Sequence, residues 1–308
     1  MRDKGLIPGR TLHCLLLCLL CLCSSAATAD DVSILIIKSH DNPFYNQSIQ
    51  NLINKTEQGA NFNIVSARAY EKNHQDYKPD IIITLGTKAA ELTHETQYKI
   101  PVIHSYITEF QIREYPGVER HYSVLLDQPL ERYLRFIQSL LPAIKVGILK
   151  TQRNQFDSSL LKNMEKSTGL EINQYLFHPD DNPVTRVRSI LQSDDVLLSL
   201  PEPLIYNHQT LKGVLLSSYR LNKPVVSYSP AHVKSGALAA IYISPSQIGI
   251  QLAGILNKLM SGLLKDQSQE FYAGGFEISI NRQVAHSLRI DIPSEQEIIQ
   301  RIQSGESP

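Results

Sequence analysis

The chain has 308 residues, and its 30 basic and 30 acidic side chains give a formal net charge of +0 at pH 7. This balance argues against a nucleic-acid partner, which requires a basic surface, and against binding to an anionic membrane surface. Because a single domain usually has about 100 to 200 residues, a chain of this length is expected to form two domains.

The first 29 residues have the pattern of a secretory signal peptide. A basic start is followed by an apolar core at 15–23, and Ala27-Thr28-Ala29 supplies the small residues of a cleavage site. The core is too short to span a membrane, which takes roughly 20 residues. We therefore predict cleavage near Asp30 and a soluble protein in the periplasm.

The cysteines support the same interpretation. All four lie inside this leader, at Cys14, Cys18, Cys21 and Cys23. Leucine, rather than a small residue, precedes Cys21 and Cys23, which argues against a lipoprotein anchor. The mature chain would have no thiol and hence no disulfide, as expected for a bacterial exported protein rather than a small disulfide-stabilised one.

After the leader, apolar runs of strand length alternate with helical patterns. A first set lies at 32–38, 62–66, 80–86 and 100–106, and a second at 144–150, 170–177, 195–200, 223–229 and 238–244. Continuous apolar strands separated by helices predict βαβ units and buried parallel sheets. The sequence therefore predicts an α/β fold with two sheets of about the same size.

Three helix starts are marked by a polar cap and a proline at the first helical position. They are Asn42-Pro43, Asn182-Pro183 and Ser244-Pro245. Ser244 also forms a capping-box pattern with Gln247. The long helix that follows places a stripe of apolar residues on one face, which predicts core packing: Ile248, Leu252, Ile255 and Leu259.

Sequence motifs of catalysis are missing. The chain has no G-x-S-x-G, G-x-G-x-x-G, P-loop or H-E-x-x-H pattern. An exported hydrolase using His104, Ser105 and Glu109 remains an alternative, although no motif fixes a nucleophile, a base and an oxyanion site together. The acidic pairs 180–181 and 194–195 are interpreted as solvated acids at helix starts. We therefore expect a binding protein without a metal or cofactor.

Four segments together carry a family resemblance. They are LGTKAAE (85–91), LERYLRFIQSLLPAIKVGILK (130–150), LNKPVVSYSPAHVKSGALAAIYISPSQIGIQLAGILNKLMSG (221–262) and FEISINRQVAHSLRIDIPSE (276–295). In this order and spacing the chain resembles the ABC transporter substrate-binding proteins that have the type I periplasmic-binding fold. In that family the first segment is a G-T-x-A-A turn, the second leads into the second lobe, and the last is the terminal strand and helix.

The resemblance implies two doubly wound parallel-sheet lobes joined by a hinge. The first would hold 30–121 plus 245–274, and the second 122–244 plus 275–308. It also implies that a small organic ligand, an amino acid or other small carboxylate, is captured between the lobes and delivered to an ABC transporter permease by a monomeric protein. An alternative partner is a membrane receptor, for which the protein would be a ligand-sensing subunit.

The turn at Gly86 is the first candidate ligand site. In open parallel sheets ligands bind outside the carboxyl ends of the strands, and Gly86-Thr87 is such an end. Gly86 would let a ligand approach the backbone, Thr87 offers a hydroxyl, and free helix-start amides attract an anion. Lys88 would add positive charge. The alternative is that Thr87 only caps the helix and that Lys88 is solvated.

Other strand ends supply the remaining candidates. Tyr45, Tyr106 and Tyr228 could stack on an aromatic or flat ligand, although each could instead be packing at a lobe edge. Glu202 could receive an amine. Thr108 and Ser229, at two of the same strand ends, complete the predicted ligand-binding set.

Overall fold

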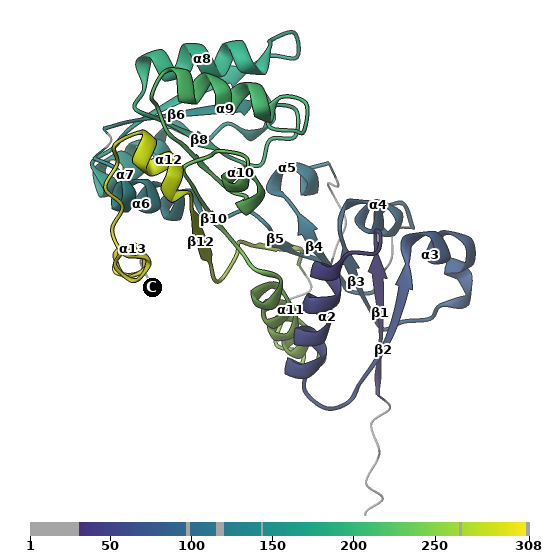
Figure 1. Cartoon of the computed structure of the whole chain (residues 1–308). Helices are drawn as coiled ribbons and strands as arrows, with labels where there is room; N and C mark the ends of the chain where they lie inside the picture. The colour runs from purple at the N-terminus through teal and green to yellow at the C-terminus, as the bar shows by residue number, and fades with distance from the viewer. Residues whose placement is uncertain (1–30, 97–98, 115–119, 143, 265–266, 306–308) are drawn as a thin grey trace, which may run out of the picture. The chain divides into compact units, whose positions relative to one another are not determined.

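The computed structural model describes residues 31–96, 99–114, 120–142, 144–264 and 267–305. The predicted signal peptide lies outside these residues. The described chain forms two six-stranded sheets with helices on both faces of each, which is the predicted α/β class (Figure 1). Within the described ranges, no helix is both long enough and apolar enough to cross a membrane.

The first sheet has the strand order β11-β5-β4-β3-β1-β2, and all its described pairings are parallel. Its strands are β1 (Val32–Lys38), β2 (Ala60–Ser66), β3 (Ile81–Leu85), β4 (Val102–Ile107), β5 (His121–Leu125) and β11 (Gln269–Phe271). Helices cover both faces, so central strands such as β3 are buried along their whole length.

Two groups of helices enclose this first sheet. On one face α2 (Pro43–Lys55) and α11 (Pro245–Met260) pack over β1, β3 and β4. On the other face lie α3 (Ala67–Asn73) and α4 (Thr87–Thr96). The shorter η1 (His74–Asp76) and α5 (Glu109–Ile112) complete this part of the chain.

The second sheet has the order β12-β10-β9-β8-β6-β7, in which β12 is antiparallel to β10 and the other pairings are parallel. The strands are β6 (Lys145–Thr151), β7 (Glu171–Phe177), β8 (Val196–Ser199), β9 (Val225–Ser227), β10 (Ala239–Tyr242) and β12 (Glu277–Ile280). An antiparallel strand at the edge of a parallel sheet is common in such folds.

Helices also cover both faces of the second sheet. Residues of α6 (Leu130–Leu140), α12 (Arg282–Ser287) and α13 (Glu295–Gln303) share one core cluster, with α7 (Ser158–Thr168) at its margin. The opposite cluster is formed with α8 (Pro183–Ser193), α9 (Leu211–Arg220) and α10 (Pro230–Lys234). The short η2 (Gln152–Asn154) links β6 to the loop before α7.

The predicted strands and helix starts are present. Asn42, Asn182 and Ser244 cap their helices, and Ser244 and Gln247 form both halves of the predicted capping box. The apolar stripe of α11 is buried except for the partly buried Leu259, which packs against the same core. These features depend on local sequence, which explains why they could be predicted.

The crossing between the sheets falls later than expected. A division between 121 and 122 would cut β5, but His121–Leu125 pairs with β4 along its length. The chain therefore leaves the first sheet only after Leu125. The later passages lie between β10 and α11 and between β11 and β12. The division of the chain into two lobes that move as separate bodies stays a prediction.

The expectation of solvated acids at 194–195 is wrong for Asp194. Asp194 is fully buried at the C-terminal end of α8, directly before β8. Its carboxylate accepts hydrogen bonds from Asn173 Nδ2 and from the Tyr175 hydroxyl, each at 2.7 Å. Because it precedes an internal strand, Asp194 is enclosed by neighbouring strands that the local sequence does not reveal.

Candidate ligand site

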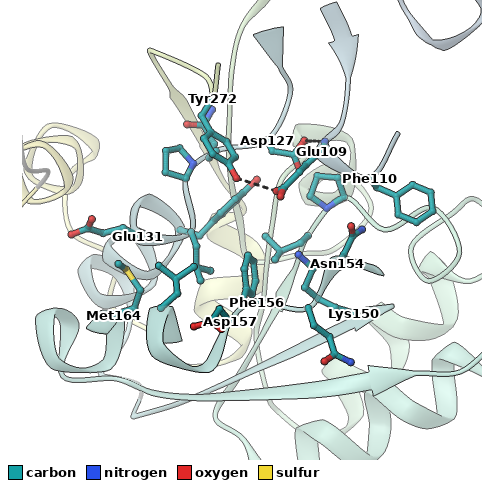
Figure 2. Close-up of a pocket in the computed structure, with 18 of the residues that line it drawn as sticks. Glu109, Phe110, Asp127, Glu131, Lys150, Asn154, Phe156, Asp157, Met164 and Tyr272 are labelled. Atoms are coloured by element: carbon teal, nitrogen blue, oxygen red, sulfur yellow. Dashed lines mark hydrogen bonds between the residues drawn. The ribbon is translucent and has the colours of Figure 1, made fainter. Parts of the chain in front are cut away.

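A cavity of about 370 Å³ opens at the carboxyl ends of strands from both sheets. Glu109 follows β4, Asp127 follows β5 and Lys150 lies near the end of β6, as Figure 2 shows. The aromatic and apolar part of the wall includes Phe110, Tyr133, Phe156, Leu160, Met164, Leu200 and Tyr272. A cavity of this volume can enclose a small organic molecule.

Hydrogen bonds around Glu109 fix one wall of the cavity. The Glu109 backbone N–H donates to Asp127 Oδ2 at 2.8 Å, and the Tyr272 hydroxyl donates to Glu109 Oε2 at 3.1 Å (Figure 2). Arg113, one helical turn on, pairs with the remaining oxygen Oε1 of Glu109. Both oxygens of the Glu109 carboxylate are therefore already bound within the protein.

Asp127 is a buried carboxyl group. Burial, together with the nearby charge of Glu109, raises its pKa to about 7, against the hydrogen bond from the Glu109 backbone and the charge of Lys150. Near neutral pH it can therefore be protonated or charged. A side chain in either state can interact with a ligand, as hydrogen-bond donor or as anion.

Lys150 faces Asp127 from the second sheet. The residue is only 6% exposed, and its Nζ lies 3.8 Å from the centre of the Phe156 ring. In the part of the chain that the structure describes, its ammonium makes no hydrogen bond and no ion pair within 4 Å. Burial lowers the pKa of Lys150, whereas the charges of Glu202, Glu109 and Asp127 act in the opposite direction.

The loop between β6 and α7 contributes Phe156 to the wall of the cavity. Its position is fixed at two points: Gln174 Oε1 accepts from the Phe156 backbone N–H at 2.7 Å, and Asp157 caps α7 by accepting from Ser159 N. Phe156 is thereby held under the Lys150 ammonium. A cation over an aromatic face is favourable, but it provides none of the hydrogen bonds that an ammonium can donate.

The predicted turn at Gly86 is shaped by the protein itself. Gly86 has φ +93°, and a Cβ at this position would collide with the Tyr45 hydroxyl and Ser39 Oγ. Ser39 Oγ accepts from Ala89 N at 3.0 Å and so caps the first turn of α4. The glycine is therefore required by two neighbouring side chains, whether or not a ligand also approaches.

Neither Thr87 nor Lys88 is left without a protein partner. Gln111 Nε2 donates to Thr87 Oγ1 at 2.8 Å. Lys88 is about half exposed, with its Nζ 3.8 Å from a Glu91 oxygen on the same helix. The cap of α4 described above comes from Ser39, and not from Thr87 as the alternative interpretation expected.

The predicted tyrosines pack against neighbouring side chains. Tyr45 is buried and meets Tyr106 edge-to-face with ring centroids 4.7 Å apart. The Tyr106 hydroxyl lies 2.7 Å from Ser48 Oγ and donates to the carbonyl of Phe44 at 3.0 Å. Tyr228 contacts His232 in the same edge-to-face way.

The other predicted residues have structural partners too. Thr108 and Ser229 cap α5 and α10. Glu202 is fully buried and accepts from Thr151 Oγ1 at 3.2 Å and Asn154 Nδ2 at 3.0 Å. The cavity lining includes none of the eight predicted residues. As ligand contacts they stay predictions.

Sequence reasoning overlooked Asp127, Lys150, Phe156 and Tyr272 and did not include Glu109 among the ligand-binding residues. A lysine directly after the apolar centre of β6, near the carboxyl end of the strand, was the available signal for Lys150. Asp127 and Tyr272 follow β5 and β11, which the apolar pattern did not reveal. These side chains could be assigned to one site only after the strands were placed.

The residues proposed for a hydrolase are not hydrogen-bonded to one another in the described chain. His104 is fully buried, with Nδ1 2.8 Å from Thr84 Oγ1 and Nε2 2.9 Å from His121 Nδ1. Ser105 Oγ is buried and has no hydrogen-bond partner in the described chain, so it is not paired with His104. Across the described residues, no group of three or more His, Cys, Asp or Glu could hold a metal ion.

Solved structures show where this fold occurs. The chain is 18% identical to a conserved domain protein from Vibrio cholerae, with a TM-score of 0.57, 88% of this chain covered and 98% of the other. An ABC domain in complex with L-Trp from Streptococcus pneumonia is 16% identical to the chain, with a TM-score of 0.56, 88% of this chain covered and 98% of the other. The ligand-free, open form of a substrate binding protein with adhesive properties from Clostridium difficile is 15% identical, with a TM-score of 0.63, 86% of this chain covered and 97% of the other.

The TM-scores show a shared fold, the type I periplasmic-binding arrangement that the resemblance implied. No curated protein matches the chain significantly. The family model described as ABC transporter substrate binding protein matches residues 45–301, which include both sheets and the cavity. The chain belongs to the ABC transporter substrate-binding protein family.

Proposed function

We propose that this protein captures a small organic ligand in the cavity between Asp127 and Lys150 and delivers it to an ABC transporter permease. The observation that carries the proposal is the cavity itself, because side chains that follow strands of both sheets line it. Binding at the carboxyl ends of parallel strands is the general rule for such sheets. The protein would act as a monomer in the periplasm after cleavage near Asp30.

The side chains of the cavity favour an amino acid or another small carboxylate as ligand. Lys150 offers an ammonium for a carboxylate, and Asp127 offers a carboxyl group for an amine or other donor. The aromatic rings of Phe110, Phe156 and Tyr272 offer apolar faces for the rest of the molecule. L-Trp is a suitable first compound to test, because a protein of the same fold binds it.

Binding is proposed to work by closure of the two lobes about the crossings between the sheets, without a chemical change in the ligand. Gly86, Thr87, Tyr45, Tyr106, Thr108, Glu202, Tyr228 and Ser229 remain proposed contacts for parts of a ligand that extend past the cavity. Turnover assays on the same compounds would detect any chemical change.

A thermal-shift screen of amino acids and small carboxylates tests the proposal. A ligand that binds only the native state stabilises it by about 2.7 kcal/mol at a hundredfold excess over its dissociation constant. Leu160→Arg places a long charged side chain at the cavity wall and should abolish the shift. Leu263→Arg is the matched control, since Leu263 is 78% exposed and lies outside the lining. A shift that survives Leu160→Arg unchanged would locate binding elsewhere, and no shift with any compound would reject capture of these ligands.

A further inference from the structure

Most charged side chains around the cavity are already matched within the protein. Glu109 pairs with Arg113 and also accepts from Tyr272. Glu131 pairs with Arg135, one helical turn away on α6. The Asp157 carboxylate accepts from Ser159 N at the start of α7. Glu109 and Glu131 are paired with arginines, and the exposed Asp157 is hydrated, so none of these acids requires a cation from the ligand.

Lys150 differs from all of them. It lines the cavity and is 6% exposed, and its ammonium lies over the Phe156 ring with no hydrogen bond or ion pair to the described chain. Withdrawing an ammonium from water is costly unless it is paired and hydrogen-bonded. The direction of the Lys150 pKa is consistent with this, because burial outweighs the neighbouring acids and lowers it.

Asp127 does not supply the missing partner of the Lys150 ammonium. Its Oδ2 already accepts from the Glu109 backbone, and no ion pair within 4 Å joins Asp127 to Lys150 among the described residues. Glu202 is also near enough to attract Lys150, but its carboxylate oxygens are bound by Thr151 and Asn154. The donors of the Lys150 ammonium are therefore available to a group that enters the cavity from outside.

We infer that Lys150 is the residue that binds the anionic group of the ligand and so selects for ligands that carry one. The inference rests on the proposed function and deepens it by assigning charge specificity to one side chain. The ligand is a monoanion, best matched by a carboxylate, whose neighbouring donor group faces Asp127. A phosphate is disfavoured, because its second charge would face Asp127 and Glu109 while Arg113 is engaged with Glu109.

Three probes with one aromatic body and different charges test the inference: 3-phenylpropionate, L-phenylalanine and 2-phenylethylamine. The wild-type protein should prefer the two carboxylates. Lys150→Met keeps most of the side-chain volume and removes the ammonium, and it should weaken carboxylate binding about 10- to 100-fold, the loss expected for a hydrogen bond to a charged group. The preference for carboxylates over the amine should disappear.

Lys145→Met is the matched control. Lys145 lies at the opposite end of β6, about half exposed and 3.5 Å from Glu171, and is absent from the cavity lining. This variant should bind all three probes as the wild type does. Lys150→Met should also melt no lower than wild type in the absence of probe, because it removes an unmatched buried ammonium. A purely structural lysine would show a lower melting temperature and unchanged affinity.

The outcomes separate the two proposals. Unchanged carboxylate affinity in Lys150→Met overturns the inference and leaves the proposed function standing. Absence of binding by the wild type, both to these probes and in the wider screen, overturns both. Should Lys150→Met fail to fold, acetylation of the wild type with acetic anhydride decides: 3-phenylpropionate should protect Lys150 and not Lys145, as read by mass spectrometry. Equal labelling of Lys150 with and without the probe would contradict the inference.

Discussion

Gly86 and Gly59 have the same backbone torsion in different surroundings. Both have φ +93°, a conformation that L side chains rarely adopt. A Cβ at Gly59 would meet nothing within 4 Å, whereas at Gly86 it would collide with Tyr45 and Ser39. A substitution at Gly59 therefore measures backbone strain alone, whereas the same substitution at Gly86 also measures the cost of displacing Tyr45 and Ser39.

Alanine at each glycine should reveal this difference. Gly59→Ala should lower the free energy of unfolding by about 1 to 2 kcal/mol, the strain of a left-handed residue. Gly86→Ala adds overpacking of a buried site and should cost about 1 to 3 kcal/mol more. Urea denaturation of both variants measures the two losses. Equal losses would show that Tyr45 and Ser39 move aside freely and do not require glycine at position 86.

Ligand affinity, measured on the same variants, tests the role originally predicted for this turn. If Gly86 also admits a ligand, Gly86→Ala should bind more weakly at a temperature where it is fully folded, and Gly59→Ala should not.

At the scale of elements, three adjacent strands of the first sheet share a buried polar chain. Thr84 on β3, His104 on β4 and His121 on β5 are linked by contacts of 2.8 and 2.9 Å between their side chains. Burial lowers the pKa of His104 to about 3 and that of His121 to about 4, and the neighbouring His121 lowers the pKa of His104 further within that total. Both rings are therefore neutral in the folded protein at neutral pH.

These histidines should make the protein less stable in mild acid. In the unfolded chain they take up protons near their ordinary pKa of about 6.5, while the folded state resists protonation until about pH 3 to 4. Stability is therefore present above pH 6.5 and is lost as the pH falls, by about 1.4 kcal/mol per pH unit for each histidine.

Urea denaturation at pH 7.5, 6 and 5 measures this slope. His104→Gln should reduce the loss of stability by about 1.4 kcal/mol per pH unit, the contribution of one histidine. His208→Gln, at an exposed position, should leave the loss unchanged. Asp127, whose pKa is raised to about 7, contributes in the opposite direction, but equally in all three proteins. Identical slopes for the wild type and His104→Gln would refute the assignment to this buried chain.

Elements with a complete local signal could be predicted from the sequence. β1 and β3 are built around isoleucine-rich apolar runs, and α2, α8 and α11 begin with a cap and a proline. β5 reads HYSVL, in which His121 and Ser123 interrupt the run although both are buried, and β11 has only three residues. Their place in the sheet comes from neighbouring strands, which no local pattern encodes.

The candidate site shows the same limit more sharply. Strand ends were predicted as ligand sites, and the cavity does lie at strand ends. Whether a side chain such as Tyr45 or Glu202 fills the core or faces the cavity depends on packing by distant segments. Lys150, Asp127 and Tyr272 meet only because β6, β5 and β11 end near one another, so their joint role could not be inferred from spacing.

At the scale of the whole molecule, the described chain passes between the two sheets three times, after β5, after β10 and after β11. A ligand held by residues on both sides of these crossings should favour a closed arrangement. Small-angle scattering should therefore give a smaller radius of gyration with a bound carboxylate than without. Lys150→Met, at the same compound concentration, is the control and should show no change. A confirmed ligand that leaves the radius unaltered would rule out closure.

Strands β11 and β12, near the C-terminus, complete the first and the second sheet, so neither sheet can finish folding before these last segments are made. Ser268 bonds to the backbone of His121, 147 residues earlier, and Arg301 on α13 reaches Ser139 on α6, 162 residues earlier. Ser48 on α2 meets Pro245 of α11 over a separation of 197 residues.

Contacts so distant in sequence form slowly, because a long loop must close before any of them stabilises the chain. A nascent chain that has emerged only as far as β10 thus exposes the unpaired edges of β5 and β10 and the apolar face of α2, all covered only when the final segments arrive.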